Sequence, residues 1–399
     1  MRFIYLDCSL KELSGHHYNF CKRIIGMAEE AGLPVTVLAN NSLPADLADE
    51  MKVNIVPYFR FSAYSVLRET VRDSLRATET VRRRMLEELR GISGIGQDDI
   101  VYVNSVLPSQ LLAVTEWVSE MGEKAPTIVA EVFYKTYIDF NESTYEENGR
   151  DFSDQVWLYV GDILPSPENM NFRLISFNSR VSNIYSRILH QPVFTLTDPL
   201  RVLAAPKNRA GKKKITIGLG GHQRHAKGYH HLEGIIHSFL RERDWDHVCF
   251  RIHNSRPDQA QDIQRSLHQL AAADNRIEIL EGSCSGEEWN AFIDSLDIVL
   301  CPYEPGAYKG SWSGLACEGF SSGAPVVVPN SSASAEFLLN YNASFEGFDD
   351  WTVPSIFEAL KKVVDHYDEY ASRNYEAASA FYENEKGANI VKEIIEKFK

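Results

Sequence analysis

The most informative stretch of the sequence is residues 308–328, YKGSWSGLACEGFSSGAPVVV. Gly310 and Gly314 open a loop that is predicted to lead into a helix carrying Glu318, and a second glycine break within 320–328 leads into an apolar strand. A glycine-rich turn at a helix N-terminus exposes unpaired N–H groups and the positive end of the helix dipole, which favour phosphate oxygens. A carboxylate one turn further along can accept hydrogen bonds from ribose hydroxyls. A glycine-capped helix packed on a sheet would give the same pattern, so this stretch alone leaves both interpretations open.

Short apolar runs alternate with helical patterns along the whole chain. The runs predicted as strands in the first half are Phe3–Leu6, Val35–Ala39, Ile100–Asn104, Thr127–Val132 and Trp157–Val160. A helix is predicted over Asn19–Ala31, because Gly32-Leu33-Pro34 is a stop signal. This alternation favours parallel sheets with crossover helices. The cation-rich stretch Ala204–Lys214 is predicted as a linker, after which the alternation restarts at Ile215–Leu219.

The composition is that of an ordinary globular protein. The chain has 399 residues, of which 44% are hydrophobic and 24% charged, and its length suggests two or three domains. A net charge of −14 argues against general binding of nucleic acid. The six cysteines form no C-x-x-C pair and are expected to be reduced thiols. No apolar run reaches the roughly 18 residues of a spanning helix, and the N-terminus lacks a signal-peptide pattern, so we expect a cytoplasmic protein.

The C-terminal half resembles GT-B-fold glycosyltransferases, especially the large retaining group numbered four. In that family a Glu-x7-Glu motif precedes a small-x-Gly-x-Pro-Val-Val strand. Glu318 matches the second glutamate, and Gly323, Pro325 and Val326-Val327 match the strand. The resemblance implies that Glu318 binds the ribose of a nucleotide-sugar donor. The first glutamate falls on Gly310, which leaves the donor sugar open.

A second match lies at residues 214–232, KITIGLGGHQRHAKGYHHL. The pattern predicts a strand that ends in the glycine turn Gly220-Gly221. In the family an arginine and then a Lys-Gly pair follow this turn, and both cations face the donor diphosphate. Lys227-Gly228 matches the pair, while the arginine position falls on His222, for which Arg224 is a nearby substitute. Fixed cations would stabilise the charge of the leaving group without a metal.

A third match is Ile277–Leu300, which is predicted to form a strand, a turn, a short helix and a buried strand. In the family the end of the first strand lies against the nucleotide base, which here is the region around Gly282, Ser283 and Cys284. The resemblance also implies that backbone N–H groups of the loop before the helix bind the diphosphate. These are the N–H groups of Ser311, Trp312, Ser313 and Gly314.

The N-terminal half offers fewer candidates. Gly15 and His16 follow the first strand, where the family has a glycine-rich loop, and Gly15 would let the backbone approach a ligand. His16 or His17 could then hydrogen-bond the donor phosphate or the acceptor, although a capping loop is an equal alternative. Glu131 ends a predicted strand, and ligands of open α/β sheets bind beyond the carboxyl ends of strands. We therefore take Glu131 and His16 as the catalytic candidates, while a structural or solvated Glu131 is the alternative.

A long helical pattern over Ser65–Arg90 carries seven arginines and follows the aromatic run Tyr58–Phe61. A basic amphipathic helix with flanking aromatics can lie on anionic lipid, so residues 58–90 are a candidate for peripheral contact with the inner membrane face. Interspersed acidic residues partly neutralise the arginines. We favour a helix that packs on the core and keeps a solvated charged face.

Two sequence patterns that could suggest a metal site are not interpreted as one. The spacing of the histidines matches no zinc motif, and the string Asp244-Trp245-Asp246 is predicted to be a turn. The histidines concerned are His222, His225, His230 and His231. We therefore predict no metal and no cofactor beside the donor.

Together these observations predict an α/β protein of the GT-B class, with two Rossmann-like domains facing each other across a cleft. The domains are expected at 1–207 and 208–399, with the last helix, about 375–399, packing back on the first. The predicted function is that of a glycosyltransferase of the hexosyltransferase type, acting on a UDP-, GDP- or ADP-sugar with retention. The acceptor would be a glycan, as in polysaccharide biosynthesis, a lipid-linked molecule or a small molecule. A GT-B epimerase or hydrolase, and a non-catalytic scaffold that binds nucleotide sugars, are the alternatives.

Overall fold

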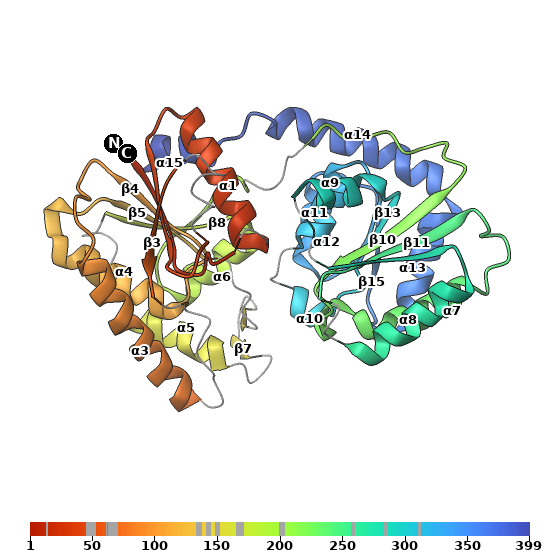
Figure 1. Cartoon of the computed structure of the whole chain (residues 1–399), viewed down its shortest axis with the longest axis horizontal. Coiled ribbons are helices and arrows are strands. Elements are labelled where there is room, and N and C mark those ends of the chain that lie inside the picture. Colours follow the sequence, from red (N-terminus) through yellow and green to blue (C-terminus); the bar gives the residue numbers. More distant parts are fainter. Residues whose placement is uncertain are drawn as a thin grey trace. The chain divides into compact units, whose positions relative to one another are not determined.

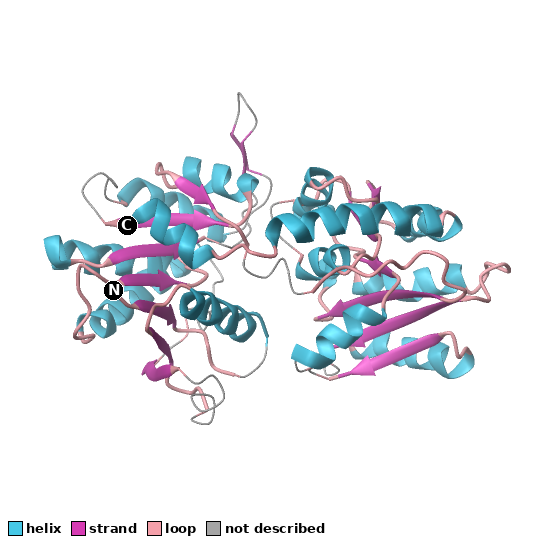
Figure 2. Cartoon of the chain, turned by 90° about the horizontal axis from the view of Figure 1, so that it is seen from above, coloured by secondary structure: helices cyan, strands magenta, loops and turns pink. Residues whose placement is uncertain are grey.

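The computed structural model describes most of the chain as two compact units. The described residues are 1–12, 15–44, 53–60, 62, 71–132, 138–140, 145–147, 152–164, 171–198, 204–256, 260–282, 284, 286–309 and 313–399. Unit 1 comprises Met1–Pro199 and Asn389–Lys399, and unit 2 comprises Leu200–Ala388. Each unit is built on a parallel sheet with helices on both faces (Figure 1, Figure 2). This confirms the prediction of two Rossmann-like α/β domains.

Unit 1 contains a seven-stranded sheet of order β3-β2-β1-β4-β5-β8-β9. Its strands are β1 (Phe3–Asp7), β2 (Val35–Asn40), β3 (Asn54–Phe59), β4 (Ile100–Val103), β5 (Thr127–Glu131), β8 (Phe172–Ser176) and β9 (Val193–Thr195). A separate antiparallel pair is formed by β6 (Ile138–Phe140) and β7 (Tyr145–Glu147). The chain moves outward from β1 in one direction and then from β4 in the other, so the order reverses between β1 and β4. In open α/β sheets such a reversal point is where ligands bind.

The helices of unit 1 cover two faces of the sheet, one packed mainly by aliphatic side chains and the other by aromatic rings. They are α1 (Gly15–Glu30), α3 (Val71–Arg90), α4 (Pro108–Met121), the 3-10 turn Gly122–Lys124, α5 (Phe152–Ile163), α6 (Ser179–Ile188) and α15 (Ile390–Phe398). Aliphatic side chains such as Leu6 and Val103 pack with α3 to α6 in one apolar core. On the other face Tyr5 and Tyr102 stack with ring centroids 5.7 Å apart, and Phe20 of α1 lies 6.2 Å from Tyr102.

The predicted strand Trp157–Val160 is wrong, because these residues lie in α5. Val156, Trp157 and Val160 are buried whereas Tyr159 is exposed, which is the spacing of a helix face. Trp157 packs edge-on against Tyr185 of α6, with ring centroids 4.9 Å apart. A run of four apolar residues is too short to show its period, so the sequence could not separate a strand from a helix here.

Unit 2 contains a six-stranded parallel sheet of order β12-β11-β10-β13-β14-β15. Its strands are β10 (Ile215–Gly221), β11 (Val248–Asn254), β12 (Ile277–Glu281), β13 (Ile298–Leu300), β14 (Val326–Pro329) and β15 (Phe345–Phe348). Here the order reverses between β10 and β13. The predicted strand–helix–strand over Ile277–Leu300 and the predicted helix and strand within 308–328 are both confirmed.

Helices cover both faces of the second sheet and bury two apolar clusters. One cluster includes α7 (Leu232–Phe239), α8 (Gln261–Ala273) and α13 (Val353–Asp365). The other includes α9 (Gly286–Ser295), α11 (Gly314–Ser321), α12 (Ala333–Asn340) and α14 (Tyr367–Glu385). Short turns complete the unit: η4 (His225–Lys227), η5 (Tyr229–His231) and α10 (Pro305–Tyr308).

The cation-rich stretch 204–214 packs against unit 2. Arg209 is only 1% exposed, and its guanidinium donates to the Asp294 carbonyl at 3.1 Å and to the Ser322 hydroxyl at 3.1 Å. Asp297 lies 3.7 Å from the same guanidinium. The cations of this stretch therefore serve in part to anchor it to the domain that follows.

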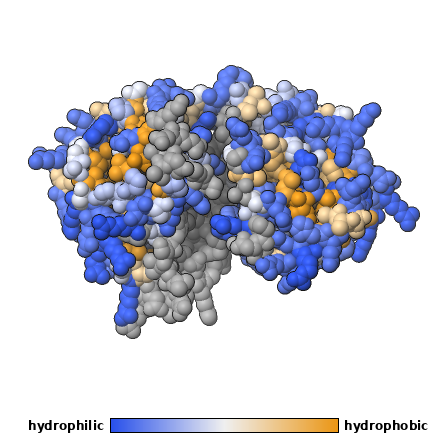
Figure 3. Space-filling view, viewed as in Figure 1, coloured by the Kyte–Doolittle hydropathy of each residue, from blue (hydrophilic) through white to orange (hydrophobic). Residues whose placement is uncertain are grey.

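The charged helix α3 pairs part of its arginines with acids. Arg82 contacts Glu79 and Glu116, and Arg90 contacts Glu120 of α4. Figure 3 shows mostly hydrophilic side chains on the face drawn, with apolar ones in separate patches. Within the described residues, no helix has the length and apolar character needed to cross a membrane. Membrane contact through residues 58–90 stays a prediction, and residues 61 and 63–70 lie outside the described part of the chain.

The chain returns to unit 1 at Asn389, while α14 belongs to unit 2. The Asn389 side chain accepts hydrogen bonds from the N–H groups of Val391 and Lys392, and it donates one to the Met27 carbonyl of α1 at 2.8 Å. One side chain thus both caps α15 and attaches it to α1.

Replacing Asn389 by alanine should loosen α15. Loss of the cap alone costs about 1 kcal/mol, and the Met27 carbonyl also loses its donor. Amide hydrogen exchange should then become faster throughout α15. Asn389→Asp keeps a capping oxygen but not the donor, so its α15 exchange rates should lie between those of the wild type and of Asn389→Ala. Unchanged exchange in both variants would contradict the anchoring role.

Candidate functional site

The carboxyl ends of the parallel strands in unit 2 meet at one edge of the sheet. At the reversal point β10 ends with Gly220-Gly221, and β13 continues into Cys301–Tyr303. The turn η4 follows β10 and brings Lys227 to this place. The region predicted to bind a diphosphate therefore coincides with the reversal point of the sheet.

Lys227 lies against the backbone of the glycine turn. Gly221 has φ +103°, and a Cβ there would lie 2.6 Å from the ammonium nitrogen of Lys227. The same ammonium is 6.0 Å from the ring centroid of Tyr303. Burial and, to a smaller degree, the positive charge of Arg224 lower the pKa of Lys227, although Cys301 and Glu318 act in the opposite direction. An anion bound beside Lys227 would therefore stabilise its charged form.

The Lys227 turn is fastened to the loop after β13. Gly228 has φ +70°, and a Cβ there would lie 1.8 Å from the Pro302 carbonyl oxygen, so only glycine fits. The Glu304 N–H donates to the Ala226 carbonyl at 2.9 Å. The Lys-Gly pair noted in the sequence thus has a packing reason as well as a charge.

Helix α11 begins beside this turn. Ser313 caps it by accepting a hydrogen bond from the Ala316 N–H at 3.2 Å, and its hydroxyl lies 3.1 Å from the Tyr303 hydroxyl. The first N–H groups of any α-helix have no partner within the helix, and α11 starts at Gly314. Glu318 lies one turn further along, partly exposed.

Trp289 of α9 connects the two parts of this site. Its indole nitrogen donates to Glu318 Oε2 at 2.7 Å. A Cβ on Gly220 would lie 3.3 Å from the Trp289 ring and 3.1 Å from that of Phe292, so Gly220 makes room for aromatic packing. Trp289 was not among the residues predicted from the sequence. Its position in the first turns of the helix after β12 could have indicated it, because the end of that strand is expected to face the base.

The other residues predicted to bind the donor lie after β10, after β12, or outside the described part of the chain. Arg224 and His222 are exposed in the segment after β10, and the charge of Arg224 is close enough to affect the pKa of Lys227. Gly282, next to the expected base region, accepts a hydrogen bond from His253 Nε2 at 2.9 Å. Ser283, Ser311 and Trp312 lie outside the described residues.

Three histidines near Lys227 pack edge-on against one tryptophan. The His225 and His230 rings are 4.1 Å apart and nearly parallel, and the His231 ring is 3.9 Å from that of His230. All three meet the Trp351 ring nearly edge-on. Burial and the neighbouring imidazoles lower the pKa of His231 to about 4. No group of side chains suited to hold a metal ion is present among the described residues.

The reversal point of unit 1 holds an Asp–His pair. Asp7 ends β1, and its Oδ2 lies 2.7 Å from His17 Nδ1 and accepts from the Asn104 amide at 2.8 Å. Burial opposes the charged imidazole, but the hydrogen bond to Asp7 and the nearby Glu131 outweigh it and raise the pKa of His17. The His16 side chain lies outside what the structure describes, and Gly15 is the first residue of α1.

Glu131 ends β5, is wholly buried, and is close enough to His17 to raise its pKa. Its Oε2 accepts from the Tyr102 hydroxyl at 3.1 Å and from the Ser105 N–H at 3.3 Å. Burial raises the pKa of Glu131 to about 8. Ser105 has φ +47°, so Glu131 supports a strained turn directly after β4.

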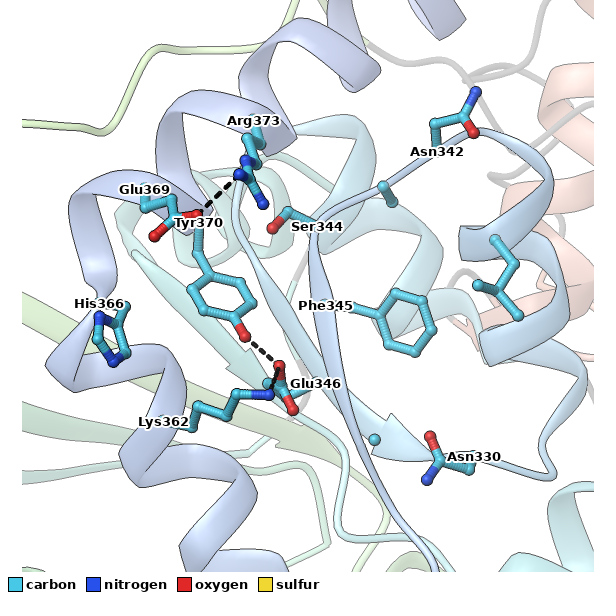
Figure 4. A pocket seen from close by; sticks show the side chains of 13 residues that line it. Asn330, Asn342, Ser344, Phe345, Glu346, Lys362, His366, Glu369, Tyr370 and Arg373 are labelled. Carbon is cyan, nitrogen blue, oxygen red and sulfur yellow. Dashed lines mark hydrogen bonds and ion pairs between the residues drawn. The ribbon is translucent and has the colours of Figure 1, made fainter.

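A hollow of about 730 Å³ in unit 2 lies elsewhere, along the edge strand β15 (Figure 4). Lys362 lies 2.7 Å from Glu346, which also contacts Tyr370, and Arg373 lies 2.8 Å from Glu369. These charges pair with one another. The lysine and the arginine that line the hollow are thus each paired with a carboxylate.

Comparison with known proteins shows the fold. No family model and no curated protein matches the chain. Among solved structures, a glycosyltransferase from Rickettsia africae has a TM-score of 0.64 at 13% identity, over 100% of this chain and 97% of that one. The Anabaena protein Alr3699/HepE in complex with UDP and glucose has a TM-score of 0.59 at 13% identity, over 96% and 95%. Sucrose-phosphate synthase from Thermosynechococcus elongatus has a TM-score of 0.60 at 12% identity, over 95% and 94%.

These similarities, together with the two parallel-sheet units, show that the chain has the two-domain, Rossmann-like GT-B fold. The fold expected from the sequence is thereby confirmed. Membership in the retaining group numbered four stays a prediction.

The raised pKa of Glu131 predicts a falling stability of unit 1 with rising pH. From pH 4.5 to about 8 the unfolded chain releases a proton that the folded carboxyl retains, so stability is lost across this range. Glu131→Gln keeps an acceptor for Ser105 but cannot titrate, and should flatten the dependence. Hydrogen exchange of the β4 and β5 amides measures it; parallel curves for the two proteins would contradict the prediction.

The lowered pKa of His231 predicts the opposite behaviour for the turns that carry Lys227. From pH 6.5 towards pH 4 the unfolded chain binds a proton that the folded imidazole does not, so stability is lost as the pH falls. His231→Phe keeps a ring against Trp351 without the titration. Hydrogen exchange of residues 225–231 should show a weaker acid dependence in the variant, whereas equal acid dependence would refute the stacking argument.

Proposed function

We propose that this protein is a glycosyltransferase that takes its sugar from a nucleoside-diphospho-sugar bound to unit 2. The observation that carries the proposal is the side chain of Lys227, which is partly buried and whose ammonium lies beside Gly221 at the reversal point of the sheet, with Glu318 one turn into the adjacent helix. Support comes from the GT-B fold and from the Anabaena structure, which contains UDP and glucose.

In the proposed complex the diphosphate lies against Lys227. Arg224 and His222 approach it from the exposed segment after β10, and Gly220-Gly221 allow the backbone to come close. The N–H groups of Ser313 and Gly314 at the start of α11 add the positive end of the helix dipole, and we propose those of Ser311 and Trp312 as further donors. Glu318 accepts hydrogen bonds from the ribose, and the base lies near Ser283. UDP, GDP and ADP remain the candidate nucleotides.

The reaction needs charge stabilisation more than a protein nucleophile. The bond between the anomeric carbon and the phosphate oxygen breaks through an oxocarbenium-like state, and a bond to the acceptor oxygen forms. The departing phosphate receives the proton of the acceptor hydroxyl. Lys227 offsets the negative charge that develops on the leaving group. We propose retention of the anomeric configuration, as the resemblance implies.

The acceptor is proposed to bind to unit 1, where Gly15 and His16 begin α1. Glu131 is wholly buried, so its proposed influence on the reacting sugar is exerted through the Ser105 turn and the His17 side chain. A glycan, a lipid-linked molecule or a small molecule are the acceptor classes, and the arginines of α3 would support peripheral contact with a membrane. The replacement of a family glutamate by Gly310 favours, as a second candidate, a scaffold that binds the donor without transferring sugar.

Calorimetry with UDP, GDP and ADP tests the donor site. For the nucleotide that binds, Lys227→Met and Glu318→Ala should each weaken binding by about 10- to 100-fold, since each removes a charged hydrogen-bonding group. The matched control is Lys361→Met, which breaks a partly buried ion pair with Glu242 in the same unit. Its affinity should equal that of the wild type.

Equal affinity of all four proteins would refute the assignment of the site. Product analysis with the corresponding UDP-, GDP- or ADP-sugar then separates the candidate functions. Sugar transfer that requires an added acceptor extract supports the glycosyltransferase, release or epimerisation of the sugar without acceptor supports the hydrolase or epimerase, and tight binding without turnover supports the scaffold.

A further inference from the structure

The contact between Trp289 and Glu318 has the geometry of a strong hydrogen bond. The indole nitrogen lies 2.7 Å from Glu318 Oε2, a distance typical of donors paired with a carboxylate. The two residues belong to different helices, α9 and α11. One carboxylate oxygen of Glu318 is therefore held by Trp289, a residue of another helix.

The indole is in turn held on several sides. Its ring lies 5.4 Å from that of Phe292 and 5.7 Å from that of His253, and a Cβ on Gly220 would lie only 3.3 Å from it. A side chain at position 220 would press on the ring. Trp289 therefore has a defined orientation, set by the end of β10 and by its aromatic neighbours.

A glutamate side chain has three rotatable bonds, and a partly exposed one samples several rotamers. Ribose hydroxyls need an acceptor at a fixed place, because a misplaced carboxylate binds them poorly. We infer that Trp289 is a positioning residue, whose N–H holds the Glu318 carboxylate in the orientation that recognises ribose and so discriminates ribonucleotides from 2′-deoxyribonucleotides. This inference rests on the proposed function of the donor site.

Unit 2 contains a second tryptophan that provides a matched control. Trp245 donates its indole N–H to Asp365 at 3.3 Å, but it is 97% buried in the apolar cluster of α7 and α13. Replacing either tryptophan by phenylalanine keeps a ring and removes one N–H···carboxylate bond. Only Trp289→Phe removes a hydrogen bond from a carboxylate at the reversal point of the sheet.

The test measures the affinity of a nucleoside diphosphate and of its 2′-deoxy analogue by calorimetry. UDP with dUDP, GDP with dGDP and ADP with dADP are the pairs, and the pair whose ribonucleotide binds tightest is used. The proteins are the wild type, Trp289→Phe, Glu318→Ala, the double variant and Trp245→Phe. We expect Trp289→Phe to reduce the preference for the ribonucleotide by about tenfold, the size of one hydrogen bond to a charged group.

The double variant distinguishes positioning from a general loss of structure. If Trp289 acts through Glu318, the double variant should bind like Glu318→Ala alone, and Trp245→Phe should keep the wild-type preference. Equal weakening of both nucleotides by Trp289→Phe, or additive losses in the double variant, would overturn the inference while leaving the proposed function intact. If the wild type binds no nucleoside diphosphate, the proposed function and the inference fall together.

Discussion

The ammonium group of Lys227 lies where burial disfavours its charge and where Arg224 adds a second positive charge. Two glycines of unit 2 make room for the Lys227 ammonium and for the turn that carries it. Gly221 leaves the space that it occupies, and Gly228 lets its turn approach the Pro302 carbonyl. A protein that places a cation in such surroundings gains from a bound anion, because the anion restores the charged form. The proposal that a diphosphate binds here therefore rests on local electrostatics as well as on the comparison with other proteins.

The two units follow one topological rule but present different chemistry. In both, the strand order reverses beside the first strand of the sheet, and polar side chains gather at the carboxyl ends there. Unit 2 presents cations at this point, whereas unit 1 presents Asp7, His17 and the buried Glu131. The first set suits a phosphate, and the second suits the hydroxyl groups and protons of an acceptor. This difference in charge supports a donor role for unit 2 and an acceptor role for unit 1.

The sequence predicted the elements better than the contacts between them. Alternating strands and helices gave the two Rossmann-like domains, because period and turn signals are local. It failed at Trp157–Val160, where four apolar residues fit a helix as well as a strand. The pairs Trp289–Glu318 and Asp7–His17 were missed for another reason. Their members lie on different elements, and only the folded sheet brings them to a common edge, so no spacing in the sequence marks them as partners.

Backbone contacts at two glycines show how the path of the chain, rather than a particular set of side chains, fixes residue identity in unit 2. The similar structures share only 12–13% identity with this chain, yet their TM-scores are about 0.6. At Gly228 a side chain would collide with a backbone carbonyl, and at Gly323 it would lie 2.4 Å from the carbonyl oxygen of Lys207. A collision with backbone cannot be relieved by exchanging a neighbouring side chain, whereas contacts between side chains can be rebuilt in many ways. The requirement for glycine at these positions is therefore set by the path of the chain.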